Sequence, residues 1–160
     1  MDTVINFYAG MMHKIVPSAA IGNAAILHDR PSPIDKMRGA MRGQPLDCDV
    51  YTRLIVDGRV LMTDAEFEHR TNMIAVHKMR GDVLIGGLGI GFIVCPLLSN
   101  REVNSITVIE KSANVIQLVS PQFPSVKIVH ADVYEWTPPK KSFDCIYFDI
   151  WANVPNSDDW

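Results

Sequence analysis

Apolar and polar positions form their clearest pattern between residues 51 and 62. Residues 51–56 and 59–62 are two β-rich segments, and Asp57-Gly58 stands between them. A two-residue type I′ turn needs positive φ at both central positions, which aspartate and glycine tolerate better than other residues. The pattern therefore predicts a β-hairpin.

A helix is expected directly after the hairpin. Thr63 and Glu66 stand three residues apart, which is the spacing of a capping box at a helix start. Apolar residues then recur at helical spacing as far as Met79. The positions expected on the buried face of this helix are Phe67, Ile74 and either Thr71 or Met73.

From residue 83 onward, strand and helix patterns alternate. Ser112 is expected to cap the second helix, and the last strand is apolar almost throughout, which is typical of a strand buried on both faces. This alternation predicts an α/β fold with a parallel sheet, right-handed crossovers and helices on both faces. The expected strands are 83–85, 105–109, 126–129 and 143–150, and the expected helices are 91–99 and 113–119.

The first 50 residues give a weaker pattern. Segment 3–8 fits either a strand or the start of a helix. Residues 29–45 are rich in proline, glycine and arginine, so we expect no long element there. Lys36, Arg38 and Arg42 fit a solvated loop better than a phosphate site, because three charges are few.

The composition is that of a globular protein. The chain has 160 residues, which is enough for one hydrophobic core, and 48% of them are hydrophobic, which argues against a disordered chain. A net charge of −3 argues against a protein that coats nucleic acid, because such proteins are usually strongly basic. We therefore expect no nucleic-acid partner.

Cysteine and histidine are sparse and scattered. The three cysteines form no CxxC motif and the five histidines form no HxxxH or HExxH motif, so we expect neither a disulfide framework nor a metal site. The sequence contains no apolar run of the length of a membrane helix, and its first residues lack the basic region of a signal peptide. We expect a cytoplasmic protein with no membrane partner.

The candidate site begins at the glycines that follow strand 83–85. Gly87, Gly89 and Gly91 are spaced as GxGxG between the strand and the next helix. Glycine allows a sharp turn and a close approach to a ligand, and a helix N-terminus favours a carboxylate or phosphate. A dinucleotide fingerprint counted from Gly87 needs glycine or alanine where Phe92 stands, so the pattern disfavours NAD and a dinucleotide oxidoreductase.

Acidic residues stand at the ends of the next three strands. Glu110 ends the second strand, where a carboxylate can accept hydrogen bonds from both hydroxyls of a ribose. Asp132 follows the third strand, where it can accept an amino hydrogen of adenine, and Asp149 ends the fourth. Ligands of open parallel sheets bind beyond the carboxyl ends of the strands, so this ordered set predicts a nucleoside site.

Together these features resemble the class I S-adenosylmethionine-dependent methyltransferases, and within them most closely the spermidine synthase group. The resemblance covers about residues 51–151 and is carried by hairpin 54–60, helix 64–69 and glycine segment 83–91. It implies a Rossmann-like, methyltransferase-type parallel sheet preceded by a β-hairpin. We accordingly divide the chain into an N-terminal extension of undefined structure, residues 1–50, and a hairpin plus nucleoside-binding domain, residues 51–160.

The resemblance also implies roles for individual residues around S-adenosylmethionine, or its decarboxylated form. Gly87, Gly89 and Gly91 would line the methionine and ribose portion. Glu110 would hold the ribose and Asp132 the adenine, while Val133 would pack on the adenine ring. Asp149 would face the reacting centre and would orient or deprotonate the acceptor. Tyr134, Trp136 and Trp151 would wall the acceptor pocket.

We therefore expect an S-adenosylmethionine-binding transferase, foremost a methyltransferase that acts on a small-molecule acceptor. One alternative is a spermidine synthase-like aminopropyltransferase, with Asp149, Asp158 and Asp159 holding a polycationic acceptor. It is weakened because Ile90 stands where the synthases have an acid in the glycine loop. The other alternative is a non-catalytic assembly module on a degenerate fold. Ile85 likewise stands where many methyltransferases carry an acid.

The resemblance further implies an incomplete sheet, because the family sheet has seven strands and the sequence predicts four. Without the later strands, Phe143, Ile146, Tyr147, Phe148 and Ile150 would lie on an exposed edge, which favours aggregation. Three explanations stay open: the N-terminal 50 residues cover the edge, two chains pair there, or the chain is a fragment. We expect a homo-oligomer.

Overall fold

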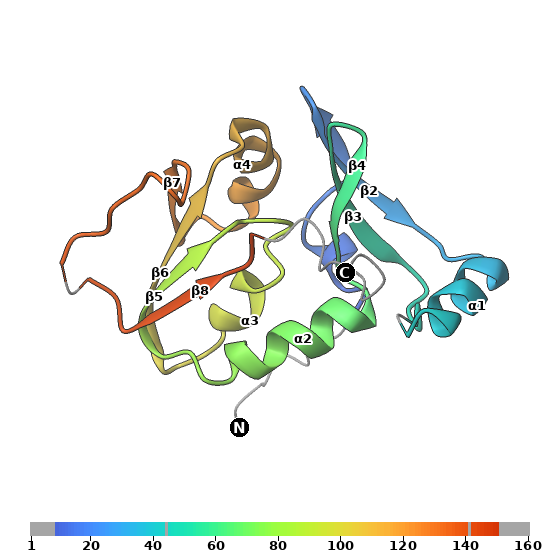
Figure 1. The fold of residues 1–160 in the computed structure, drawn as a ribbon, viewed down its shortest axis with the longest axis horizontal. Helices are drawn as coiled ribbons and strands as arrows, with labels where there is room; N and C mark the ends of the chain where they lie inside the picture. Colours follow the sequence, from blue (N-terminus) through green and yellow to red (C-terminus); the bar gives the residue numbers. More distant parts are fainter. Residues whose placement is uncertain (1–8, 44, 141, 151–160) are drawn as a thin grey trace, which may run out of the picture.

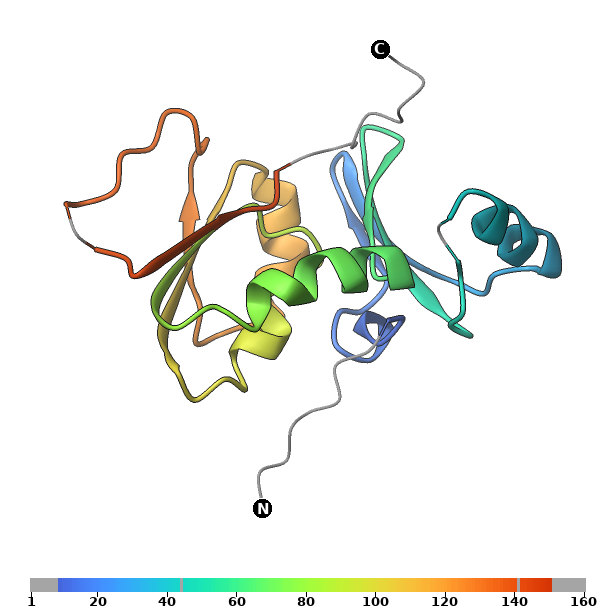
Figure 2. The same ribbon diagram turned by 60° about the horizontal axis from the view of Figure 1, so that its bottom comes forward.

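The computed structural model describes residues 9–43, 45–140 and 142–150. Predictions about segment 3–8, Trp151, Asp158 and Asp159 fall outside these ranges. Two four-stranded sheets lie side by side, one antiparallel and one parallel, and helix α2 (Glu66–Val76) runs past both of them (Figures 1 and 2).

The antiparallel sheet has the strand order β1-β2-β3-β4. The hairpin over residues 51–63 confirms the prediction, since Asp57 and Gly58 at its turn have φ values of 52° and 74°. The other two strands come from the first 50 residues, where small apolar side chains gave a weak pattern. The bounds are β1 Ala19–Ile21, β2 Ala24–Asp29, β3 Tyr51–Val56 and β4 Arg59–Thr63.

Helix α1 (Pro33–Met41) corrects the expectation of no long element over residues 29–45. Ser32 and Asp35 form a capping box, and Pro33 occupies the first helical turn, where a missing N–H costs nothing. The glycines and prolines therefore bound this helix rather than abolish it. None of its residues is buried, and the helix stands away from the sheets (Figure 1).

The start of α2 is also corrected, because Thr63 ends β4 and the helix begins after Ala65 without a side-chain cap. Asp64 is fully buried, and its carboxylate accepts hydrogen bonds from the backbone N–H of Met12 at 2.7 Å and of Thr52 at 2.6 Å. Burial raises the pKa of Asp64. This carboxylate fastens the 3₁₀ turn η1 (Met12–Lys14) to the base of the hairpin.

The buried face of α2 also differs in part from the prediction. Its buried residues are Asn72, Met73 and Val76. Met73 confirms one of the expected positions, whereas Ile74 is 66% exposed, so its predicted burial is wrong.

The parallel sheet has the order β7-β6-β5-β8. In order along the chain this is 3-2-1-4, the beginning of a Rossmann-like sheet, and the predicted fold class is confirmed. Ser112 caps α4 as expected, since its side chain accepts a hydrogen bond from the N–H of Val115. The bounds are β5 Gly81–Gly86, α3 Val94–Leu97, β6 Val103–Glu110, α4 Ala113–Val119, η2 Ser120–Gln122, β7 Lys127–His130 and β8 Cys145–Phe148.

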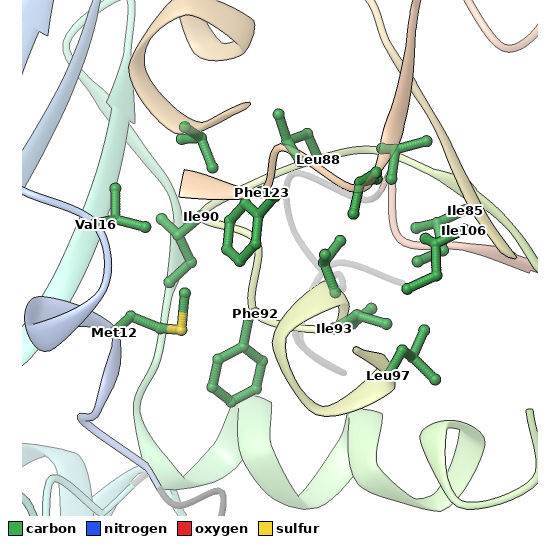
Figure 3. Packing of buried hydrophobic residues seen from close by; sticks show 14 of the residues in the cluster. Met12, Val16, Ile85, Leu88, Ile90, Phe92, Ile93, Leu97, Ile106 and Phe123 are labelled. Atoms are coloured by element: carbon green, nitrogen blue, oxygen red, sulfur yellow. The ribbon is translucent and has the colours of Figure 1, made fainter. Parts of the chain in front are cut away.

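The main core lies on one face of the parallel sheet. Val83 and Ile85 of β5 pack there with buried residues of α2, α3 and α4. Figure 3 shows Met12 of η1 beside Ile90, with Phe92 over α2. Because η1 joins this core, the N-terminal segment and the parallel sheet share one interior.

The face of the parallel sheet opposite the core differs from the prediction of helices on both faces. Among the described residues, α2, α3 and α4 all pack on the core face, and the segment between β7 and β8 lies on the other side (Figures 1 and 2). Ile146 and Phe148 are consequently 55% and 46% exposed, so the prediction that this strand is buried on both faces is wrong. Within the described residues β8 is an edge strand and the antiparallel sheet does not cover it.

Candidate functional site

A cleft of about 640 Å³ lies at the carboxyl ends of the parallel strands, facing the β3–β4 hairpin. The residues that line it from the hairpin side include Arg59 and Met62. From the parallel sheet, six of the seven predicted site residues line it: Gly87, Gly89, Glu110, Asp132, Val133 and Asp149. A cleft of this size is typical of small-molecule sites.

The glycine turn brings the two sheets together. Gly87 and Gly89 have positive φ values of 95° and 53°, which side chains disfavour. A Cβ at Gly89 would lie 2.5 Å from the sulfur of Met62 on β4, and a Cβ at Gly87 would collide with the backbone oxygen of Asp149. Glycine therefore keeps the turn in contact with both the hairpin and the end of β8.

Gly91 lies behind the turn and is not among the residues that line the cleft. Gly91 is buried and has a φ of 76°, and its Cα packs against the ring of Phe123. A side chain at this position would collide with that ring, so packing in the core accounts for the glycine. The helix that follows, α3, is four residues long. The first residue of α3 does not line the cleft either, so the structure does not bring the N-terminus of this helix to the site, whereas Ser112, the cap of α4, does line it.

Glu110 is fastened to the glycine turn through its carboxylate. Oε2 accepts a hydrogen bond from the backbone N–H of Leu88 at 2.9 Å, and Oε1 accepts one from the N–H of Ser112 at 2.8 Å. Each carboxylate oxygen has a second lone pair. The carboxylate thus has a fixed orientation at the cleft and retains capacity for two further donors.

Asp132 and Val133 follow β7 at the neighbouring strand end. Oδ1 of Asp132 accepts a hydrogen bond from the N–H of Tyr134 at 2.9 Å, which holds the carboxylate in a local turn. Tyr134 is 79% exposed and lines the cleft, whereas Trp136 is not among the lining residues. Of the predicted acceptor walls that the structure describes, only Tyr134 is thus placed at the cleft.

Asp149 follows β8 and extends its pairing with β5, because its N–H donates to the oxygen of Gly86 at 2.8 Å. Burial raises the pKa of Asp149. Glu68 of α2 lines the same end of the cleft, and burial together with the negative charge of Asp149 raises the pKa of Glu68 to about 7. The sequence pattern did not identify Glu68, because a helix that starts at Thr63 makes Glu66 the acid of the capping box and gives Glu68 no role.

At the rim of the cleft, side chains join the tips of the two sheets. Nδ2 of Asn23, between β1 and β2, donates to Oδ1 of Asp57 at 2.8 Å. Oδ1 of Asn23 accepts from Nδ2 of Asn114 on α4, also at 2.8 Å. The turn of the hairpin is thereby connected to the parallel sheet through three exposed polar residues.

The charge of the cleft is predominantly negative. Its ionisable lining residues are five acids, Asp57, Glu68, Glu110, Asp132 and Asp149, and two bases, Arg59 and Lys111. This balance favours a positively charged ligand. Across the described ranges, no three histidine, cysteine, aspartate or glutamate side chains are grouped to hold a metal ion. None of the described helices has the length and apolar character needed to cross a bilayer.

Comparisons with known proteins gave structural neighbours only. No family model and no curated protein matched the sequence. Among solved structures, the chain is similar to a spermidine synthase from Thermotoga maritima, with a TM-score of 0.48 and 22% identity, over 83% of this chain and 45% of that one. It is also similar to a spermidine synthase in complex with the transition state analogue AdoDATO, with a TM-score of 0.47 and 21% identity, over 83% of this chain and 46% of that one.

The chain therefore spans less than half the length of either neighbour. The assignment of a Rossmann-like fold rests on the strand order of this structure itself.

Proposed function

We propose that the cleft binds S-adenosylmethionine and that the protein transfers the methyl group to a small-molecule acceptor. The observation that carries this proposal is the position of Glu110. Its carboxylate is bonded to the backbone of the glycine turn on the adjacent strand, and Asp132 stands at the next strand end along the sheet. A ribose and an adenine attached to each other would meet these two carboxylates in that order.

The chemistry of the side chains at this end of the cleft fits this cofactor. Glu110 offers hydrogen-bond acceptors to ribose hydroxyls, and Asp132 offers them to an adenine amino group. Val133 provides an apolar side chain beside them. The acidic lining suits a ligand with a positively charged sulfur atom, and the decarboxylated form carries still more positive charge.

In this proposal each residue has a limited task. When bound, S-adenosylmethionine supplies an electrophilic methyl group on a sulfonium. Gly87 and Gly89 keep the backbone close to the ligand, with Gly91 supporting the turn from behind. Glu110, Asp132 and Val133 orient the nucleoside. Asp149 orients the acceptor and accepts its proton, and the hairpin excludes water from one side.

Aminopropyl transfer is the second candidate function, because the excess of acids in the cleft also suits a cationic acceptor. Ile90, at the position where the synthases carry a loop acid, is fully buried in the core beside Met12 (Figure 3). The two candidates differ in the ligand that they require: S-adenosylmethionine for methyl transfer and its decarboxylated form for aminopropyl transfer. The homo-oligomer, the cytoplasmic location and the division at residue 50 stay predictions.

Calorimetric titration tests the proposal. The ligands are S-adenosylmethionine, its demethylated thioether product, the decarboxylated form and NAD. We expect binding of the first two and none of NAD. Preference for the decarboxylated form would favour aminopropyl transfer, whereas binding of none of the four would contradict the proposal and favour the assembly module.

A further inference from the structure

We infer that Glu68, which lines the cleft together with Asp149, forms with it a pair of carboxylates that takes up the proton of the acceptor. The acceptor would accordingly be a nucleophile that arrives with a removable N–H or O–H proton. This inference deepens the proposed function and rests on it. It adds to that function a residue on α2 and the chemical class of the acceptor.

The spacing of α2 against β8 places the pair. Glu68 and Asn72 are four residues apart on the helix, a rise of about 6 Å. Tyr147 and Asp149 are two residues apart along the strand, about 6.6 Å, and point to the same face of the sheet. Two residues of the helix can therefore meet two residues of the strand at once.

The first contact between α2 and β8, that of Asn72 with Tyr147, is a direct hydrogen bond. The hydroxyl of Tyr147 donates to Oδ1 of Asn72 at 2.7 Å, and Asn72 is only 3% exposed. Nδ2 of Asn72 donates to the backbone oxygen of Glu68 at 3.0 Å. Asn72 thus fixes the position of α2 relative to β8, and with it the turn of the helix that carries Glu68.

The second contact between α2 and the end of β8, that of Glu68 with Asp149, is electrostatic. Burial and then the charge of Asp149 raise the pKa of Glu68, while burial raises the pKa of Asp149. The pKa of Tyr147 is also raised, by burial and then by the charges of Asp149 and Glu68. All three groups respond to a common, poorly hydrated environment, in which two carboxylates resist being charged together.

The remaining ionisable groups nearby belong to other parts of the site. Glu66 and His69 are on α2 itself, Asp57 and Arg59 line the cleft from the hairpin, and Glu110, Lys111 and Asp132 line it from the parallel sheet. The charge that raises the pKa of Glu68 is that of Asp149 and not that of any of these groups. The pair is therefore an electrostatic unit within the larger acidic cleft.

The proton balance of methyl transfer gives this unit a task. The lone pair of the acceptor forms the new bond to the methyl carbon, the carbon–sulfur bond breaks, and its electron pair stays on sulfur. The proton displaced from the acceptor passes to one carboxylate of the pair, Asp149 or Glu68. A pair with a raised proton affinity holds this proton better than a single solvated carboxylate does.

The same balance restricts the acceptor. A thioether acceptor has no proton to lose, and a thiol is acidic enough to ionise without a strong base, so neither needs such a pair. An anionic acceptor would be repelled by the charge of the pair. Amines and hydroxyl compounds whose attacking atom is neutral, with or without a positive charge elsewhere in the molecule, match both the proton requirement and the charge.

Proton release on ligand binding tests the inference without knowledge of the acceptor. A positive sulfur close to the pair lowers its proton affinity, so binding of S-adenosylmethionine near pH 7 should expel about half a proton per site. Calorimetry in two buffers with different ionisation enthalpies measures this number. The demethylated product has no charge on sulfur and should release clearly less.

Variants on one helix separate the pair from its surroundings. Glu68→Gln should still bind S-adenosylmethionine but lose the proton release. Glu66→Gln, which changes an acid on the same helix outside the cleft lining, should behave like the unmodified protein. In the free protein, carbon-13 NMR of the carboxyl groups should give Glu68 a titration midpoint near 7, which Asp149→Asn lowers.

The outcomes distinguish the inference from the proposed function. If S-adenosylmethionine binds without proton release, or if Glu68→Gln leaves the release unchanged, the inference is wrong and the proposed function stands. If S-adenosylmethionine does not bind, the proposed function fails and the inference fails with it. An ordinary NMR midpoint for Glu68 in the free protein contradicts the pairing, whatever the ligand does.

Discussion

The two ends of the cleft hold their carboxylates in different ways. At the end that we propose binds the nucleoside, called the nucleoside end, backbone N–H groups of Leu88 and Ser112 bind the carboxylate of Glu110 and fix its direction. At the end that we propose binds the acceptor, called the acceptor end, Glu68 comes from a helix and Asp149 follows a strand, and their pKa values are raised. The first arrangement suits orientation of a ligand by hydrogen bonds, and the second suits exchange of a proton.

Loss of the Glu110 carboxylate should have the largest effect. In the proposed complex two ribose hydroxyls donate hydrogen bonds to the charged carboxylate of Glu110, and Glu110→Ala removes both, so an adenosyl ligand should bind about 1.5–3 kcal/mol more weakly. Calorimetry measures the change, and denaturant unfolding of the free variant shows whether the turn at Leu88 survives. Glu102→Ala, at the other end of β6, is the control. Equal affinity of both variants would contradict the role given to Glu110.

Removal of the Tyr147 hydroxyl should have the next largest effect, a loss of stability. It tests the contact that holds α2 against β8 at the acceptor end. Tyr147→Phe leaves the buried Oδ1 of Asn72 without its donor, which should lower the free energy of unfolding by about 1–2 kcal/mol. Urea denaturation measures this difference. Tyr134→Phe, at a side chain that is 79% exposed, should change little. Similar losses in the two variants would show that the contact with Asn72 does not hold α2 against β8.

The smallest effect is expected in the pH dependence of stability. The pKa of Glu68 rises from 4.5 to about 7 on folding, so the folded protein binds more protons than the unfolded chain between these values. The resulting stabilisation is complete below pH 4.5 and is lost as the pH rises through 7. Glu68→Gln should therefore be more stable than the unmodified protein at pH 8, by about 1 kcal/mol after allowance for solvent screening.

Unfolding curves of both proteins at pH 4 and pH 8 provide this measurement. The advantage of Glu68→Gln should be absent at pH 4, where the carboxyl group is protonated in both states. An equal difference at the two pH values would mean that folding does not raise the pKa of Glu68 and would remove this contrast between the two ends.

Local signals in the sequence were sufficient for much of this molecule. The Asp57-Gly58 turn, the cap at Ser112 and the parallel sheet depend on neighbouring residues or on a regular alternation, and the structure confirms them. The acids at the strand ends reach one cleft because parallel strands end at a common edge.

What the sequence did not reveal depends on distant contacts. The carboxylate of Asp64 is bound in a buried site by the N–H groups of Met12 and Thr52, and α2 begins after Ala65 instead of at Thr63. The exposure of Phe148 likewise depends on which elements cover the sheet, which the apolar pattern of β8 does not encode.

The hydrogen bonds at the rim have a mechanical consequence. The base of the hairpin is held by the buried carboxylate of Asp64, and its tip is joined to α4 by side-chain hydrogen bonds of Asp57, Asn23 and Asn114, which compete with water. Each such bond contributes only about 0.5–1.5 kcal/mol. The wall that the hairpin gives to the cleft is therefore secured by buried bonds at its base and by bonds open to water at its tip, while Leu54 of β3 anchors it in the core.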